Sequence, residues 1–274
     1  MTDMPLLVAA ILGLVEGITE FLPVSSTGHL IVAGSLLGYV GERAATFEIV
    51  IQVGAILAVV WHYRAVLSEL VGRAFTAPAE QRLAGNLALA FLPAALVGLG
   101  LHHWIKANLF TPVTVAAAFI VGGIVILVME WRRPIVTTND VHAVSLRQAL
   151  GIGCAQMLAL IPGTSRSAAT ILGGYAFGLS RPAATEFSFL LAIPTLVAAA
   201  GYDGFKSRHL FTRADVPLFV VGTAVSFIAA LVVIRGFLRF VQSHSFRVFA
   251  WYRIAFGAVI LLLAALHLLR MDAA

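Results

Sequence analysis

The amino-acid sequence predicts an all-α polytopic membrane protein with six transmembrane helices and two re-entrant helical hairpins, arranged as an inverted-topology repeat. Three observations predict this fold: the composition, six long apolar stretches, and two apolar regions that proline and polar residues interrupt. The 274 residues are 60% hydrophobic and 11% charged, with a mean hydropathy of +0.97. Because a soluble domain carries about 25% charged residues, a soluble fold could not hide this apolar surface, and the bilayer must act as the solvent.

Six apolar stretches are long enough to cross a bilayer as helices, which takes about 20 residues. They cover residues 45–63, 83–103, 112–131, 185–202, 216–235 and 248–269. Pro93 and Pro194 lie inside two of these stretches. Because proline removes a backbone hydrogen bond within a helix, we expect a kink at each of them.

Two further apolar regions, residues 5–38 and 145–178, are interrupted near their centres by proline and polar side chains. Each has an apolar helix, a polar break and a second short helix. This is the pattern of a re-entrant hairpin, which enters the membrane and leaves it on the same side. Irregular backbone at that depth is tolerated only inside protein or beside a wet cavity, so we expect both breaks to be enclosed in this way.

The two halves of the chain repeat each other at a constant offset of 139 residues. The offset carries Pro23 to Pro162, Ser26 to Ser165, and the Ala-Ala-Thr run at 44–46 to the same run at 183–185. We therefore divide the chain into a first repeat, 1–139, and a second repeat, 140–274, each with one hairpin and three spans. Since three is odd, the second repeat starts on the opposite side of the membrane, and the two hairpin tips can meet near the midplane.

The charges predict an orientation and not a nucleic acid partner. The net charge of +5 is explained by basic residues in the loops of a membrane protein. Ten Lys and Arg fall on the side opposite the N-terminus and six on the N-terminal side, with Arg166 and Arg253 inside membrane segments. The side with ten is expected to be cytoplasmic, so both termini and the first hairpin face outward. The single cysteine, Cys154, cannot form an internal disulfide and is expected to be a packing residue.

Two glutamates lie in the first helix of the first hairpin. Glu16 and Glu20 are four residues apart, so they lie one above the other on one face of the helix. Two such carboxylates repel each other unless a cation or a proton lies between them, and oxygen ligands suit Mg²⁺ or Ca²⁺. The alternative is that the glutamates pair with Arg166 and bind no metal.

The first break carries three hydroxyl residues and a histidine, in the run Pro23-Val24-Ser25-Ser26-Thr27-Gly28-His29. One hydroxyl could serve as the N-cap of the following helix, but this explains three hydroxyls and a histidine poorly. Ser26 and His29 are three residues apart, so one helical turn could bring the imidazole to the hydroxyl. Such a pair is a minimal activated nucleophile.

The second break is expected to form a cradle for an oxyanion. Gly163 permits close approach of the backbone, and Ser165, Ser167 and Thr170 carry hydroxyl donors. Arg166 has a planar guanidinium that matches phosphate oxygens, and the free N–H groups of the next helix also favour an anion. The alternative is that Arg166 only neutralises Glu16 or Glu20.

Together, the two tips provide a nucleophile, a base, cation-binding carboxylates and a phosphate clamp, which are the parts needed for phosphoryl transfer. A site within the bilayer suits a substrate with a phosphate head group and a lipid tail. The main alternative is a transporter of a polyprenyl phosphate, because inverted repeats with broken helices at the midplane are typical of transporters. A transporter needs no nucleophile, so Ser26 with His29 favours an enzyme.

Two motifs in these breaks resemble the signature motifs of the bacterial undecaprenyl-diphosphate phosphatases, also called bacitracin-resistance proteins. The resemblance covers essentially the whole chain, including its length and number of spans. The motifs are Glu16-Gly17-Ile18-Thr19-Glu20-Phe21-Leu22-Pro23-Val24-Ser25-Ser26-Thr27-Gly28-His29 and Pro162-Gly163-Thr164-Ser165-Arg166-Ser167-Ala168-Ala169-Thr170.

The resemblance implies hydrolysis of undecaprenyl pyrophosphate to undecaprenyl phosphate and inorganic phosphate, with a divalent cation, at the outer (periplasmic) side of the bacterial inner membrane. This reaction recycles the lipid carrier of peptidoglycan synthesis and confers bacitracin resistance. The residues implicated are Glu16, Glu20, Ser26, His29, Ser165, Arg166, Ser167 and Thr170.

The roles that we assign to these residues are hypotheses. Ser26 attacks the terminal phosphorus, and His29 takes or orients its proton. Glu16 and Glu20 hold Mg²⁺ or Ca²⁺, and Arg166 with the hydroxyls of the second break stabilises the phosphoryl charge. Attack by water or by His29 itself remains an alternative. The sequence does not determine the oligomeric state, although the Gly122-Gly123 pair would permit the close helix packing of a homodimer.

Overall fold

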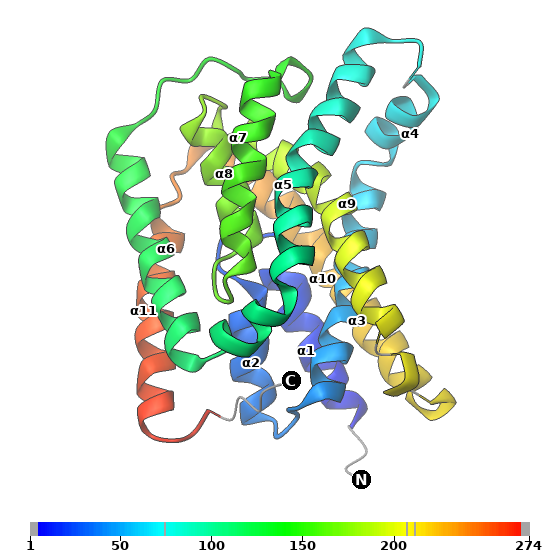
Figure 1. Cartoon of the computed structure of the whole chain (residues 1–274), viewed down its shortest axis with the longest axis vertical. Coiled ribbons are helices and arrows are strands. Elements are labelled where there is room, and N and C mark those ends of the chain that lie inside the picture. The colour runs from blue at the N-terminus through cyan, green and yellow to red at the C-terminus, as the bar shows by residue number, and fades with distance from the viewer. Residues whose placement is uncertain (1–4, 74, 207, 211, 270–274) are drawn as a thin grey trace.

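The computed structural model describes residues 5–73, 75–206, 208–210 and 212–269 (Figure 1). Within these ranges the chain is helical, apart from connecting segments and an isolated parallel bridge between Thr138 and Leu179. Six of the described helices are long and apolar enough to cross a membrane, which confirms a multi-pass membrane protein. These six are α3 (Glu42–His62), α5 (Pro78–Leu109), α6 (Pro112–Arg132), α9 (Arg181–Lys206), α10 (Val216–Ser243) and α11 (Arg247–Ala265).

The six helices match the predicted spans, and most extend beyond them. The longest, α5, has 32 residues and begins with Pro78, where the missing N–H is not needed for helix hydrogen bonding. Polar residues at the ends continue the helices past the apolar stretches, because the backbone hydrogen bonds do not depend on an apolar side chain. Pro93 and Pro194 lie inside α5 and α9, and the kinks at these residues stay a prediction.

Four short helices form the two hairpins. They are α1 (Leu6–Thr19) with α2 (Ser26–Leu36), and α7 (Leu146–Gln156) with α8 (Arg166–Ala176). At 1.5 Å per residue each is roughly 16–21 Å long, which is too short to cross an apolar core of about 30 Å. In Figure 1, α1 and α2 occupy the lower half of the molecule, and α7 and α8 the upper half. The depth of the hairpins in a bilayer, the inverted repeat and its boundary at residue 139 remain predictions.

The remaining described elements are short connections. They are α4 (Arg64–Arg73) and four 3₁₀ turns, η1 (Val141–Ala143), η2 (Met157–Leu160), η3 (Arg208–Leu210) and η4 (Arg213–Asp215).

Small residues let the helices pack closely around the hairpins. A Cβ atom added at Gly17 of α1 would lie 2.4 Å from the carbonyl oxygen of Ser226 in α10, so the two backbones touch. Likewise, a Cβ atom at Gly123 of α6 would lie 2.7 Å from the carbonyl oxygen of Ala250 in α11. The Gly122-Gly123 pair therefore packs α6 on α11 within one chain, and a homodimer remains an untested prediction.

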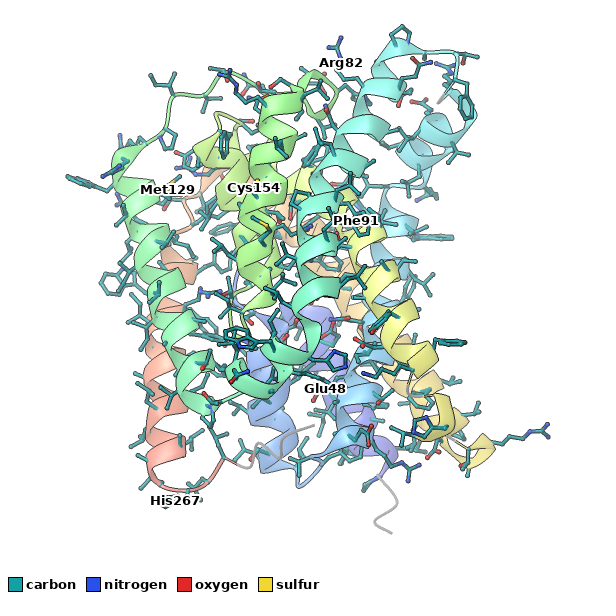
Figure 2. All side chains as sticks on the ribbon, in the orientation of Figure 1. Glu48, Arg82, Phe91, Met129, Cys154 and His267 are labelled. Carbon is teal, nitrogen blue, oxygen red and sulfur yellow. The ribbon has the colours of Figure 1, made fainter. Side chains whose placement is uncertain are left out.

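The expectation for Cys154 is wrong, because its side chain is exposed on α7 (Figure 2). The neighbouring Gly153 and Ile152 take the inner face of this helix instead. A Cβ atom at Gly153 would lie 2.6 Å from the carbonyl oxygen of Ala90 in α5, and Ile152 is fully buried in the core.

Candidate active site

The two hairpin tips border one cavity of about 200 Å³, which α3, α5 and α9 enclose on its other sides. Four of the predicted site residues line this cavity: Glu20 and Ser26 from the first tip, and Ser165 and Arg166 from the second. The structure therefore brings the two polar breaks together, although they are more than a hundred residues apart in the sequence.

A chain of polar contacts crosses this cavity from one tip to the other. The Ser26 hydroxyl donates a hydrogen bond of 2.5 Å to Oε2 of Glu20. The guanidinium of Arg166 donates to Oε1 of the same carboxylate, from Nε at 3.4 Å and from Nη2 at 3.3 Å. Since all three side chains are nearly buried, Glu20 links the hydroxyl of one hairpin to the cation of the other.

The backbone of the first tip aims Ser26 at Glu20. Ser25 has a φ of +70°, a conformation that a residue with a side chain rarely adopts, and α2 begins at the next residue. The Ser25 side chain makes no capping hydrogen bond to α2. The N-cap explanation of these hydroxyls therefore fails at Ser25, and both serine side chains border the cavity.

The second tip places Arg166 by helix capping. The Ser165 hydroxyl accepts the N–H of Ala168 at 3.1 Å, so it is the N-cap of α8, and Arg166 is the first residue of that helix. Before it, Gly163 has a φ of +89°. A Cβ atom at this glycine would lie 2.5 Å from the carbonyl oxygen of Val115 in α6, so a larger residue could not take its place.

Two hydroxyls of the predicted oxyanion cradle lie elsewhere. Ser167 and Thr170 are fully buried. Ser167 donates to the carbonyl oxygen of Leu22 at 2.7 Å, and Thr170 donates to that of Arg166 at 2.9 Å. Both hydroxyls are satisfied by carbonyl groups because they point away from the cavity into helix contacts. Ser167 thereby ties the second tip to the first.

Glu16 provides a test of the predicted cation site. Its carboxylate is completely buried, and neither oxygen has a hydrogen-bond partner. A buried carboxylate without a partner is costly, so this group fits a bound cation or a proton. Among the described residues no group of three or more His, Cys, Asp or Glu could hold a metal. Glu16 and Glu20 could bind Mg²⁺, which usually keeps several waters and takes only one or two carboxylates.

We had expected His29 to contact Ser26, and this expectation is wrong. Its Nδ1 lies 2.7 Å from the carbonyl oxygen of Ser25, and its Nε2 lies 2.6 Å from the hydroxyl of Tyr252 in α11. The ring also stacks on Phe256, with centroids 4.2 Å apart. One turn into α2, the imidazole meets the free carbonyl of the preceding loop before it can reach Ser26, and Glu20 takes the position beside the hydroxyl.

The structure adds one residue that the sequence interpretation left without a role. Arg253 of α11 is completely buried, and its guanidinium donates to four backbone carbonyls. The acceptors are Pro23 at 3.3 Å, Gly163 at 3.1 Å, Ala118 at 2.9 Å and Phe119 at 3.4 Å. Because Pro23 and Gly163 belong to the two tips, Arg253 holds both loops on α6. The signal in the sequence that could have found it is an arginine inside a membrane segment, which is costly there without partners.

Comparison with known proteins shows the family of the chain. The family described as bacitracin resistance protein BacA matches residues 9–259. A protein of Rhodospirillum rubrum named undecaprenyl-diphosphatase 2 is 58% identical over 257 residues, which cover 93% of this chain and 94% of the relative. Undecaprenyl-diphosphatases of Ectopseudomonas mendocina and Pseudomonas fluorescens are 54% and 53% identical, over 95% and 92% of both chains. These matches extend over more than nine-tenths of the chain, and the chain belongs to the bacitracin resistance protein BacA family.

Proposed function

We propose that this protein hydrolyses undecaprenyl pyrophosphate to undecaprenyl phosphate and inorganic phosphate. Its relatives are named undecaprenyl-diphosphatase, and each of them matches this chain over nearly its whole length. The observation that carries the proposal is the buried chain of contacts from Ser26 through Glu20 to Arg166. It unites a hydroxyl nucleophile, a carboxylate base and a phosphate-binding cation in one cavity inside a membrane protein.

In the first step, the Ser26 oxygen attacks the terminal phosphorus of the diphosphate, and Glu20 accepts the hydroxyl proton. The new Ser26 O–P bond forms as the bridging P–O bond breaks, and the electron pair leaves with the lipid phosphate. The hydrogen bond of 2.5 Å places Glu20 within reach of that proton. We assign this role to Glu20 in place of His29, whose two nitrogens are held by other groups.

In the second step, water attacks the phosphorus of phosphorylated Ser26, and the Ser26 O–P bond breaks. The serine oxygen takes back the proton that Glu20 holds, and Glu20 accepts a proton from the attacking water. Inorganic phosphate leaves, and Glu20 then releases its proton to solvent. Arg166 stabilises the charge on the phosphoryl oxygens in both steps, since its guanidinium can exchange a carboxylate for a phosphate without a change of shape. Glu16 and Glu20 would hold the divalent cation, which would supply further neutralisation of the phosphate charge.

We place this reaction at the outer side of the bacterial inner membrane. The distribution of Lys and Arg supports that side, because the positive-inside rule puts the end of the bundle with α1 and α2 outward. In Figure 2, Arg82 lies at one end of the bundle and His267 at the other. In this orientation Arg82 is on the cytoplasmic side. The product of the reaction, undecaprenyl phosphate, is the lipid carrier that peptidoglycan synthesis uses again.

The test measures phosphate release by the purified protein from a polyprenyl pyrophosphate. The wild type is expected to release phosphate in the presence of Mg²⁺ or Ca²⁺, and a chelator is expected to stop the release. Glu16→Gln should raise the cation concentration needed for half-maximal rate by at least about ten-fold. A rate that is unchanged by the chelator and by Glu16→Gln would rule out the cation site.

Quenching the reaction during turnover tests the covalent step. Mass spectrometry should find phosphate on the peptide that contains Ser26, and none in Ser26→Ala. Turnover that survives in Ser26→Ala would show that Ser26 is not the nucleophile and that water or His29 attacks instead, while leaving the hydrolysis of the diphosphate established.

A further inference from the structure

A second cavity of about 330 Å³ lies beside the catalytic one. Its lining comes from α3, α5 and α9, the same three helices that enclose the catalytic cavity, and from η3. Six of its lining residues are ionisable: Glu42, His103, Lys106, Asp203, Lys206 and His209. The proposed mechanism uses none of them.

The two cavities follow each other along the same helices. On α3 the lining passes from Ile49 of the second cavity to Gln52 of the catalytic one, which is less than one turn away. On α9 it passes from Asp203 to Ala199, again about one turn. Glu48, which precedes Ile49, lies in the lower half of the molecule in Figure 2. The second cavity therefore lies between the catalytic cavity and the proposed outer end of the bundle.

Two ammonium groups border this cavity, and no ion pair joins either of them to another described residue. Among the residues that the structure describes, neither Lys106 nor Lys206 takes part in an ion pair, although Glu42 and Asp203 line the same cavity. Lysines near helix ends often extend to the membrane surface and serve no ligand. These two are exposed to solvent, come from different helices and border one open cavity, and a surface role alone does not require that two lysines converge on it.

We propose that the second cavity is a phosphate-binding vestibule of the catalytic cavity, with Lys106 and Lys206 as its cationic ligands. The proposal rests on the proposed function, because that reaction brings in a diphosphate head group and releases inorganic phosphate. Either of these would present the same chemistry, a phosphate oxygen that accepts from an ammonium group. The second cavity borders the same helices as the catalytic cavity and lies toward the proposed outer end of the bundle, where a phosphate leaving Arg166 would reach water.

The lining of the second cavity carries both lysines and carboxylates, which would let a phosphate pass through without binding tightly. Formal charges of two lysines and two carboxylates cancel, so the vestibule exerts no strong net field on an anion. Binding then depends on local contacts with the ammonium groups, which are partly opposed by Glu42 and Asp203. A weak site of this kind accepts a phosphate without trapping it, whereas a strong site at the outer end would hold the product and slow its release.

The experiment compares the wild type with Lys106→Gln, Lys206→Gln and the double variant, using a polyprenyl pyrophosphate as substrate and inorganic phosphate as inhibitor. The double variant is expected to change the inhibition constant of phosphate, the KM of the lipid, or both, by at least about five-fold, as for other charged contacts at a binding site. The kcat should change less than two-fold, because neither lysine touches the reacting atoms.

Two controls separate a vestibule from a structural effect. Lys106→Arg with Lys206→Arg should restore both constants, and Arg82→Gln, at the other end of the bundle, should change neither. A larger inhibition constant alone would identify the released product as the ligand, and a larger KM alone the lipid head group. If the double variant folds and keeps both constants, the proposal is wrong while the hydrolysis stands.

Direct binding distinguishes failure of this inference from failure of the proposed function. Titration of inorganic phosphate into Ser26→Ala, followed by phosphorus NMR, needs no turnover. Loss of binding in the double lysine variant would support the vestibule even if no hydrolysis were found, and equal binding in both proteins would overturn it.

Discussion

The two hairpin tips have similar sequences and different tasks. Ser26 and Ser165 occupy equivalent positions at the offset of 139 residues. Ser26 donates to the carboxylate of Glu20, whereas Ser165 accepts a backbone N–H as the N-cap of α8. One serine is thus available for chemistry, and the other shapes the loop that presents Arg166.

The two hairpins also carry charges of opposite sign. The positions equivalent to Glu16 and Glu20 are Ala155 and Ala159, and the position equivalent to Arg166 is Thr27. The first hairpin therefore carries the carboxylates and the second carries the guanidinium cation, so neither could form the buried ion pair alone. This difference teaches that the site exists only where the two hairpins meet, and each prediction below tests one part of it.

Exchange of the charges between the hairpins should have the largest effect. Glu20→Arg and Arg166→Glu would each leave an uncompensated charge in the cavity and should lower kcat by about 10³-fold or more. The combined variant would restore the ion pair and with it the thermal stability, but not the activity, because the base beside Ser26 would still be missing. Phosphate release and thermal unfolding in detergent measure the two properties.

Recovery of activity in the combined variant would contradict this assignment. It would show that the pair only holds the hairpins together. Ala159→Glu offers a matched control, because it adds a carboxylate at the equivalent position of the other hairpin. Combined with Glu20→Arg, it should not restore the activity that the loss of Glu20 removes.

Alanine at the two equivalent serines should separate chemistry from capping. Ser26→Ala is expected to lower kcat by about 10³-fold, as is typical when a group that acts in the transition state is removed. Ser165→Ala should instead lower the free energy of unfolding by about 1 kcal/mol, the usual cost of a lost N-cap. Comparable losses of kcat at nearly unchanged stability in both variants would mean that both serines touch the substrate.

Much of the fold could be predicted from the sequence, because its signals are local. The six spans follow from the length of apolar stretches, and the breaks at Pro23 and Pro162 follow from proline and clustered hydroxyls. The two hairpin tips could be joined into one site only through the repeat, and Glu20, Ser26 and Arg166 indeed line one cavity.

The direction of each side chain could not be predicted in the same way. Spacing of three residues suggested that His29 reaches Ser26, but the choice between Ser26, Ser25 and Tyr252 depends on α11, which is more than 200 residues away. The burial of Ser167 and Thr170 likewise depends on contacts with Leu22 and Ser188. Such tertiary contacts leave no periodic signal in the chain.

Loss of Arg253 should loosen both tips at once. Arg253→Met removes the donors that hold Pro23 and Gly163, and buried carbonyls left without a partner cost about 1–3 kcal/mol each. We therefore expect a fall in the free energy of unfolding of about 3 kcal/mol, measured in detergent, together with a lower kcat. Gly122→Ala should act in the same direction, because its Cβ atom would collide with the guanidinium.

A cysteine pair can report on the tips independently of stability. In a Cys154→Ala background, Thr27→Cys and Thr164→Cys place one thiol on each side of the catalytic cavity. Arg253→Met should change their rate of disulfide formation. An unchanged rate would show that the loops keep their positions without this arginine.

The smallest effect is expected at Tyr252, which holds the far side of His29. Tyr252→Phe removes one hydrogen bond and keeps the stacked ring, so stability should fall by about 1 kcal/mol and kcat only a few-fold. If His29 acts only through its contact with Ser25, His29→Asn, which can still donate to that carbonyl, should also retain measurable turnover with the pH profile of the wild type. A shift of the lower limb of that profile in His29→Asn, with no shift in Tyr252→Phe, would instead assign the proton transfer to the imidazole and leave Glu20 as a ligand of the cation only.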